Sequence, residues 1–303
     1  SLCDSDASFM RLECCATCSA DDAEREPNSA INAASSSSSS SAAAATASSS
    51  AAASLGPPDC AYVADEPNAL DNAGGIAPIF ERIASNPAYS VHVHSHSPWL
   101  IELPSLLSQE ECVGLRRAIG GEDGSRLARS TVVPEHGKAA ERVVNYRSSK
   151  TAWCGSAECR THPTHVAVLE RLMGMLGLPV GNAEPMQLIE YELGDRYGKH
   201  HDWVPQFTHN VVGPRVLTFF LYLSDVADGG ETSFDVLNIS VRPKMGSALL
   251  WSNADEVDYL KRDGRLTHEA VPVIGGTKVA ANVWVHPADF IAARTRGCLR
   301  KLR

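Results

Sequence analysis

A series of short apolar runs in the second half of the chain limits the fold most. Gly, Pro, Asn and Asp residues separate these runs, which is the pattern of β-strands joined by turns. The four clearest runs are Met186–Glu192, Val216–Leu223, Ala248–Trp251 and Val279–Val285. Helical patterns precede the runs instead of alternating with them, which disfavours βαβ units. We therefore predict a mainly β, α+β fold: a β-sandwich or jelly-roll barrel flanked by helices.

Two amphipathic helices are expected before the strands. Ser108 and Glu111 have the spacing of a capping box, which predicts a helix from there through Ile119. Apolar residues at helical spacing predict a second helix that ends near Gly177, namely Val166, Leu169, Leu172, Met173 and Leu176. A short strand is expected over residues 98–103.

The N-terminal region has a composition that cannot contribute to this core. Between Ala33 and Ser54 the chain contains only Ala and Ser, apart from Thr46, and so lacks the side chains that build a core. We divide the chain into a Cys-rich segment at 1–27, a disordered Ser/Ala linker at 28–57 and a folded domain at 58–303. The jelly-roll core is expected at about 184–290.

The charge balance excludes some functions. Against 27 Lys and Arg the chain has 36 Asp and Glu, a formal net charge of −9. Broad nucleic-acid binding needs a basic face, as does a helix that lies on a membrane surface, so both are disfavoured. No run of ~18 apolar residues occurs, and we predict no transmembrane helix in this chain. The oligomeric state has no signal in the sequence.

Nine cysteines indicate an oxidising compartment, because four of them fall within the first 18 residues. An odd number leaves at least one unpaired within the chain. Cys154 and Cys159 lie in a Gly/Ser loop, where we expect a local disulfide bond; two free thiols are the alternative. The single sequon, Asn238-Ile239-Ser240, agrees with a secretory route.

The Cys-rich segment resembles the second half of a ShKT toxin-like domain. The resemblance rests on the spacing Cys3-x10-Cys14-Cys15-x2-Cys18. Asp21 stands where the last cysteine of that pattern is expected, and the first half is missing. We interpret the segment as a partial or degenerate module, with an unstructured Cys-rich tail as the alternative.

A His-x-Asp triplet near residue 200 is the candidate metal site. On an extended segment His200 and Asp202 point to the same face, and His268, just before the last strong strand, supplies a third ligand. Two imidazoles and one carboxylate make the facial triad of non-haem Fe(II) oxygenases. Zinc accepts the same residue types, so these residues leave both metals open.

Lys278 favours an oxygenase with a keto-acid cosubstrate. It follows His268 by ten residues and begins the next strand. A dicarboxylic keto acid that chelates iron has a far carboxylate, and this carboxylate needs a cation in a pocket where an unpaired charge is costly. Alone, Lys278 would be a solvated residue at a strand end; beside the triad, the cosubstrate role is preferred.

Several stretches in their order along the chain resemble the prolyl 4-hydroxylase (alpha subunit-like) family of Fe(II)/2-oxoglutarate dioxygenases. They are Tyr146–Ser149, Met186–Asp202, Gly213–Val226, Gly229–Phe234, Val241–Leu250 and His268–His286. The resemblance spans roughly Ile101 to Phe290. It implies a double-stranded β-helix, which is a jelly roll, and the cofactors Fe(II), 2-oxoglutarate, O2 and L-ascorbate.

The resemblance also implies roles for individual residues. Iron would be held by His200, Asp202 and His268. The distal carboxylate of 2-oxoglutarate would pair with Lys278 and the hydroxyls of Tyr191 and Thr232. Near the peptide substrate the resemblance places Tyr197, Arg215 and Trp284, although Trp284 as plain core and Arg215 as a strand-entry ion pair are alternatives. No catalytic residue is expected beyond the metal ligands.

Two departures from the family pattern affect the substrate more than the chemistry: Lys199 replaces a common Pro, and His201 replaces an aromatic residue. The family implies hydroxylation of peptidyl-proline at C4 in proline-rich or collagen-like secreted proteins, with release of succinate and CO2, in the endoplasmic reticulum or secretory pathway. Two alternatives remain: the same oxygenase chemistry on another side chain or a small molecule, and a non-catalytic secreted binding module.

Three further histidines, His92, His94 and His96, alternate along a short segment. A regular strand would place them on one face, where they could bind a metal. A polar strand edge is the favoured interpretation.

Overall fold

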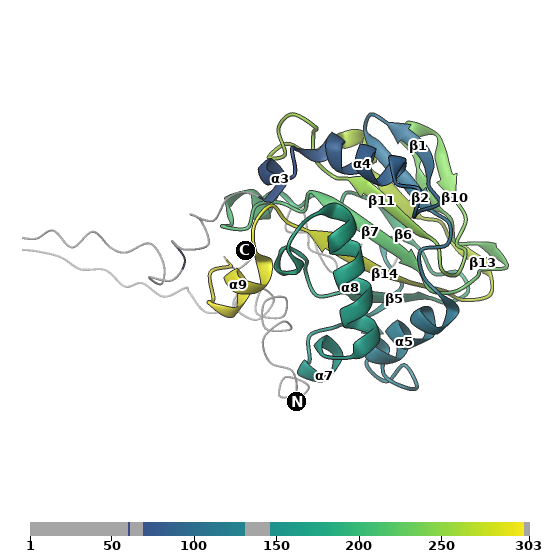
Figure 1. Ribbon diagram of the computed structural model, residues 1–303. Coiled ribbons are helices and arrows are strands. Elements are labelled where there is room, and N and C mark those ends of the chain that lie inside the picture. The colour runs from purple at the N-terminus through teal and green to yellow at the C-terminus, as the bar shows by residue number, and fades with distance from the viewer. Residues whose placement is uncertain (1–59, 61–68, 131–145, 300–303) are drawn as a thin grey trace, which may run out of the picture. The chain divides into compact units, whose positions relative to one another are not determined.

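The computed structural model describes Cys60, residues 69–130 and residues 146–299 of the chain (Figure 1). All of these belong to one compact unit, Asp59–Arg300. The expectations for the Cys-rich segment at 1–27, its ShKT-like motif and the linker at 28–57 lie outside the described residues. None of the described helices has the length and apolar character needed to cross a membrane.

The larger of two main sheets has eight antiparallel strands. In spatial order they are β1 (His92–His96), β2 (Trp99–Leu103), β11 (Ala248–Ser252), β7 (Leu217–Tyr222), β14 (Lys278–Val285), β5 (Gln187–Tyr191), β4 (Lys150–Trp153) and β3 (Ala128–Arg129). The four predicted apolar runs are thus confirmed as β5, β7, β11 and β14, and the strand predicted at 98–103 is β2.

The smaller sheet has four antiparallel strands, in the order β10 (Ile239–Val241), β9 (Thr232–Phe234), β12 (His268–Ala270) and β6 (Tyr197–His200). A short pair, β8 (Asp228–Gly229) and β13 (Val273–Gly275), stands apart from both. From β5 to β14 the chain passes back and forth between the two sheets, with only β9 and β10 consecutive in the smaller one. This path is that of a jelly roll, so the predicted fold is confirmed.

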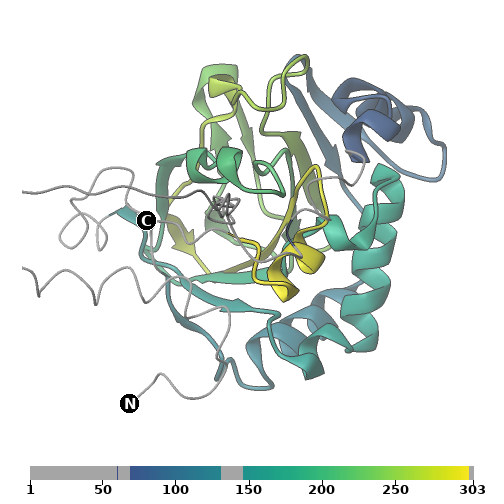
Figure 2. The same cartoon turned by 90° about the vertical axis from the view of Figure 1, so that its left-hand side faces the viewer.

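Helices cover the outer face of the larger sheet (Figure 1). The α-helices in the described part of the chain are α3 (Ala69–Asn72), α4 (Ile76–Ser85), α5 (Gln109–Gly120), α7 (Ala157–Arg160), α8 (Pro163–Leu176) and α9 (Phe290–Thr295), of which α4 and α5 contact strands of this sheet directly. The second view shows α8 running along one side of the barrel, where it contacts both α4 and α5 (Figure 2). The predicted capping box begins α5: the Ser108 hydroxyl accepts from the Glu111 N–H, and the Glu111 carboxylate accepts from the Ser108 N–H. As predicted, Gly177 ends α8 in the left-handed region, with φ 68°.

Alternation along β7 and β14 separates two cores. In β7 the side chains of Leu217, Phe219 and Leu221 pack against the helices, whereas Phe220 and Tyr222 face the barrel interior. In β14 the residues Val279, Ala281, Val283 and Val285 belong to the helix side. Because successive strand residues face opposite ways, Lys278, Ala280 and Asn282 face the interior. The face of the barrel wall that packs against the helices is therefore apolar, whereas the face toward the barrel interior also carries polar groups.

Two disulfide bonds occur in the described residues. Cys154–Cys159 confirms the predicted local bond. Cys60–Cys298 joins residues 238 positions apart and was not predicted. Cys112 is a buried free thiol, and burial raises its pKa to about 11.

Candidate active site

Two strands of the smaller sheet bring the predicted metal ligands together. His268 on β12 is the register partner of His200 at the end of β6, and Asp202 follows two residues later. Their ligand atoms all lie within 4.8 Å of one another. The Nε2 atoms of His200 and His268 each lie 3.9 Å from an Asp202 carboxylate oxygen. No other group of three His, Cys, Asp or Glu residues in the described part of the chain has such geometry.

Backbone carbonyls fix the protonation of both imidazoles. The Nδ1 of His200 lies 2.8 Å from the Gly198 carbonyl, and the Nδ1 of His268 lies 2.9 Å from the Leu266 carbonyl. Because a carbonyl only accepts, each Nδ1 carries the proton and each Nε2 keeps a free lone pair. Burial lowers the pKa of His200 well below its usual value, which favours the neutral form that binds metals.

A directional chain of hydrogen bonds holds the Asp202 carboxylate. The Thr218 hydroxyl donates to Asp202 at 2.8 Å, the Asn253 amide donates to Thr218 at 2.7 Å, and the Trp251 indole donates to Asn253 at 2.8 Å. Burial alone would raise the pKa of Asp202, but the nearby His268, His200 and Arg215 side chains lower it below its ordinary value. The carboxylate is thus ionised and oriented. Sequence reasoning missed this chain of donors.

The donor set fits Fe(II). Two neutral imidazoles and one carboxylate on one face leave the remaining coordination positions for other ligands, as in the facial triad of non-haem iron oxygenases. Aromatic rings enclose the site: Tyr197 stacks on His200 with centroids 3.6 Å apart, and Trp251 meets His268 edge-on at 4.9 Å. These rings cover part of each imidazole.

His201 lies between two ligands in sequence and takes no part in the cluster. Its Nδ1 accepts from the Trp203 N–H, and its Nε2 donates to the Asp263 carbonyl. Burial lowers its pKa to about 4. With both ring nitrogens in hydrogen bonds, the His201 ring offers no lone pair to a metal at the triad.

Lys278 is a buried cation without a hydrogen-bond partner among the described residues. Its Nζ lies 5.2 Å from the ring centroid of Phe220, 5.3 Å from that of Tyr191 and 5.6 Å from that of Tyr222. Burial lowers its pKa to about 7. An ammonium in this position is unfavourable alone, and a carboxylate ligand would supply the missing acceptor.

Two predicted cosubstrate residues lie around this lysine. Tyr191 is the register partner of Lys278 across β5 and β14. Thr232 on β9 accepts a hydrogen bond of 2.8 Å from the Tyr222 hydroxyl. Tyr222 was not predicted, although its place two residues after Phe220 puts it on the interior face. The two predicted residues line one small cavity with the triad, together with Ile189, Tyr197, Phe220, Trp251, Glu269, Ala270 and Asn282.

The three predicted substrate residues have different surroundings. Tyr197 lines the cavity, and the Arg147 guanidinium lies 4.4 Å from its ring centroid. Arg215 forms a bidentate ion pair with Glu184, at 2.5 Å and 3.0 Å, and lies 3.7 Å above the Trp284 ring. Trp284 is only 6% exposed. These contacts agree with the alternative interpretations, in which Arg215 forms an ion pair and Trp284 belongs to the core. The substrate roles of both residues stay predictions.

Glu184 is the centre of a buried network that sequence reasoning missed. It is 2% exposed, and besides the ion pair with Arg215 it lies 2.9 Å from His286 Nε2. Burial would raise its pKa, but the Arg215 charge and the hydrogen bonds from His286 and Arg215 lower it to about 2. Glu184 and Arg215 are 31 residues apart, so no sequence pattern links them.

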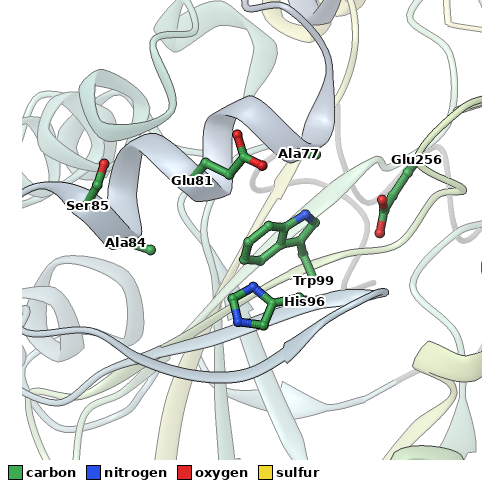
Figure 3. A pocket seen from close by; sticks show the side chains of 7 residues that line it. All are labelled: Ala77, Glu81, Ala84, Ser85, His96, Trp99 and Glu256. Carbon is green, nitrogen blue, oxygen red and sulfur yellow. The ribbon is translucent and has the colours of Figure 1, made fainter.

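Two other features lie outside the triad. A shallow hollow beside α4 is lined by His96, Trp99, Glu256 and Glu81, among others (Figure 3). None of the three metal-ligand candidates lines it. At His94 a register shift interrupts β1, and the His94 ring pairs with Glu102 at 3.0 Å. Because β1 is the outermost strand of its sheet, the polar-edge interpretation of these histidines is confirmed.

Known proteins share this site region. Residues 186–286 match the family described as the 2OG-Fe(II) oxygenase superfamily. Prolyl 4-hydroxylase subunit alpha-1 of Gallus gallus is 33% identical over 198 residues, which cover 62% of this chain and 36% of the relative. The same subunit of Rattus norvegicus is 36% identical over 170 residues, covering 53% and 30%. A solved structure, the viral collagen prolyl hydroxylase of Paramecium Bursaria Chlorella virus-1 in complex with 2OG, is 24% identical, with a TM-score of 0.49 and coverage of 62% and 95%.

The chain spans about a third of the length of these two curated relatives. The matched residues include all three metal-ligand candidates and Lys278, and they coincide with the jelly-roll strands from β5 to β14. Residues 186–286 of this chain form a domain of the 2OG-Fe(II) oxygenase superfamily.

Proposed function

We propose that the chain is an Fe(II)- and 2-oxoglutarate-dependent dioxygenase that hydroxylates peptidyl-proline at C4 in proline-rich or collagen-like secreted proteins. Succinate and CO2 are the other products, and L-ascorbate keeps the iron reduced. One observation carries the proposal: a largely buried His-Asp-His cluster shares a barrel interior with the buried ammonium of Lys278, which has no hydrogen-bond partner among the described residues. This pairing fits a metal with a keto-acid cosubstrate better than a hydrolytic zinc site, which has no use for the second cation.

His200, Asp202 and His268 hold the metal, and Lys278 binds the distal carboxylate of 2-oxoglutarate. The bound iron and keto acid supply the oxidant for an unactivated C–H bond. The residues of the chain orient the metal ligands and protect the reacting atoms from water. The hydrogen bond from Thr218 fixes Asp202, and the aromatic walls exclude water from the reacting atoms.

Proline is the proposed target because the curated relatives that match this chain are prolyl 4-hydroxylase subunits. In the chain, Tyr197 supports the assignment, since it stacks on the metal-ligand candidate His200 and lines the cavity wall. Arg215 and Trp284 form a stacked pair, and Trp284 follows by two residues on β14 the cavity-lining Asn282. Tyr191 and Thr232 complete the cosubstrate site.

A secretory location, in the endoplasmic reticulum or beyond, is part of the same proposal. Two disulfide bonds in the described residues support it, because such bonds persist in oxidising compartments.

The test is 2-oxoglutarate turnover by the Fe(II)-loaded full chain, with a poly-proline peptide and a Pro→Ala peptide as control. Mass spectrometry of the peptide locates any added oxygen. We expect one oxygen atom per modified proline, no product with His200→Ala, and full product with His92→Ala, which changes an exposed histidine on the outermost strand. Binding of 2-oxoglutarate should fail in Lys278→Met.

Two results would redirect the proposal. Succinate formation without oxidation of the peptide would keep the oxygenase and replace its substrate with another side chain or a small molecule. A folded, iron-bound protein that turns over no member of a broad substrate panel would favour the non-catalytic binding module.

A further inference from the structure

The turn between β9 and β10 ends at Asn238, a residue that takes no part in the metal site. A short 3-10 helix, Asp235–Leu237, connects the two strands, and Asn238 ends it with φ 52° and ψ 41°. Asn238 is the one described non-glycine residue with a positive φ, and asparagine tolerates this left-handed conformation better than most residues. Its backbone N–H donates to the Asp235 carbonyl at 3.0 Å. The turn therefore has a defined shape, with the Asn238 side chain at its end.

Asn238 begins the only Asn-x-Ser/Thr triplet in the 303 residues, followed by Ile239 and Ser240. Asn238 and Ser240 are both exposed. The Asn238 side-chain amide forms no hydrogen bond with the part of the chain that the structure describes. The triplet is thus complete in sequence and exposed at both polar positions. The Asn238 amide is not held by a hydrogen bond to another described residue.

The surroundings of the turn suit a bulky polar group. β10 is the outermost strand of the smaller sheet, so among the described residues no strand pairs with one side of its backbone, and such an edge favours pairing with other chains. Val236, two residues before Asn238, is 63% exposed. By contrast, Thr232 and Val241 of the same hairpin are buried and face the barrel. A group attached at Asn238 would cover the outer edge and leave the cavity open.

We propose that Asn238 is an acceptor of an N-linked glycan. The donor class is an oligosaccharide linked to a lipid diphosphate. A bond forms between the Asn238 Nδ2 and the anomeric carbon of the sugar, and the bond from that carbon to the diphosphate oxygen breaks. The lipid diphosphate leaves with the bonding electrons, and one amide proton passes to a base of the transferase, without oxidation or reduction. The two disulfide bonds support passage through a compartment where such donors occur.

The experiment uses the full chain, directed into the secretory pathway of cultured animal cells by a cleavable leader and recovered from the medium. Peptide N-glycosidase treatment in heavy-oxygen water, followed by peptide mass spectrometry, marks each formerly glycosylated asparagine as an aspartate that carries the heavy isotope. We expect the mark at Asn238 in most of the secreted protein. A loss of apparent mass on the gel after treatment should accompany it.

Two variants separate modification from folding. Asn238→Gln places a residue with poorer tolerance for φ 52° in the turn, so Ser240→Ala serves as the gentler variant, because it removes the triplet and leaves the turn residue unchanged. Both should lose the mark, and Ser240→Thr should keep it. Asp123→Asn, added to Ser240→Ala, creates an Asn-Gly-Ser triplet in another exposed turn and reports whether the host modifies this protein.

Secreted protein with an unmarked Asn238, beside a marked Asp123→Asn control, would overturn the proposal. So would a mark that persists in Ser240→Ala. Neither result bears on iron binding or turnover, because Asn238 lies outside the residues assigned to metal, cosubstrate or substrate.

Discussion

Glu184→Gln removes one buried charge with almost no change in side-chain shape. In the folded protein the Glu184 carboxylate neutralises Arg215 through two hydrogen bonds and lies against His286. The substitution leaves the Arg215 guanidinium with a neutral amide in a site that is 15% exposed. Breaking a buried ion pair from one side costs about 3–5 kcal/mol, because the remaining charge is uncompensated.

The pKa of Glu184 gives a second value for what the ionised carboxylate contributes to the free energy of unfolding. It lies at about 2 in the folded protein, against an ordinary value of 4.5, a difference of about 2.5 units. At about 1.4 kcal/mol per unit, the ionised carboxylate contributes about 3 kcal/mol to the free energy of unfolding. Because the folded-state pKa is lowered, this contribution is complete above pH 4.5 and is lost as the pH falls through 2. Between pH 7 and pH 3.5 the loss is about 1 kcal/mol.

The assay is urea unfolding of wild type and Glu184→Gln at pH 7 and pH 3.5, followed by tryptophan fluorescence. We expect the variant to be less stable by about 3 kcal/mol at pH 7, and this difference in the free energy of unfolding to shrink by about 1 kcal/mol at pH 3.5. Glu158→Gln is the matched control, since Glu158 pairs with Arg126 on the surface, where side chains are 78% and 41% exposed. Its effect should stay below about 1 kcal/mol.

If the free energies of unfolding of wild type and Glu184→Gln differ by less than about 1 kcal/mol at pH 7, this reasoning is refuted. A large gap of the same size at both pH values would show that packing, and not the ion pair, explains the stability of this region.

Three further predictions concern the metal, the cosubstrate and a disulfide bond. Thr218→Val keeps side-chain volume but removes the donor to Asp202, so Fe(II) affinity measured by calorimetry should fall about 10- to 100-fold, and an unchanged affinity would remove Thr218 from the metal site. Lys278→Met should abolish 2-oxoglutarate binding while raising the melting temperature of the ligand-free protein, because an unpaired buried ammonium is replaced by an apolar chain; a lower melting temperature would contradict that account. Cys159→Ser opens the short loop to Cys154 and should cost about 2 kcal/mol in urea unfolding, whereas equal stability would mean that the loop is held by packing alone.

Local patterns in the sequence predicted most of the barrel wall. The apolar runs that became β5, β7, β11 and β14 are long enough for their composition and the turn residues between them to identify them. The strands of the smaller sheet are only three or four residues long, and they carry polar ligands in place of an apolar pattern. The resemblance and the His-x-Asp spacing located the candidate ligands on β6 and β12, but these strands themselves were not predicted.

The missed parts of the site depend on pairs that are distant in the chain. Thr218 and Asn253 meet across β7 and the turn after β11, and Glu184 reaches Arg215 and His286 from before β5. No spacing rule links such positions, since the fold itself creates each pair. Cys60 and Cys298 illustrate the same limit, because nothing local to either cysteine indicates its partner.

The bond between Cys60 and Cys298 has a mechanical consequence. It joins two points near the ends of the compact unit, so the chain between them is a covalently closed loop that contains both sheets. Tension between the segment before Cys60 and the segment after Cys298 passes through one sulfur–sulfur bond. The hydrogen bonds that hold the metal ligands in register carry none of that load, and the site keeps its geometry while the chain is stretched.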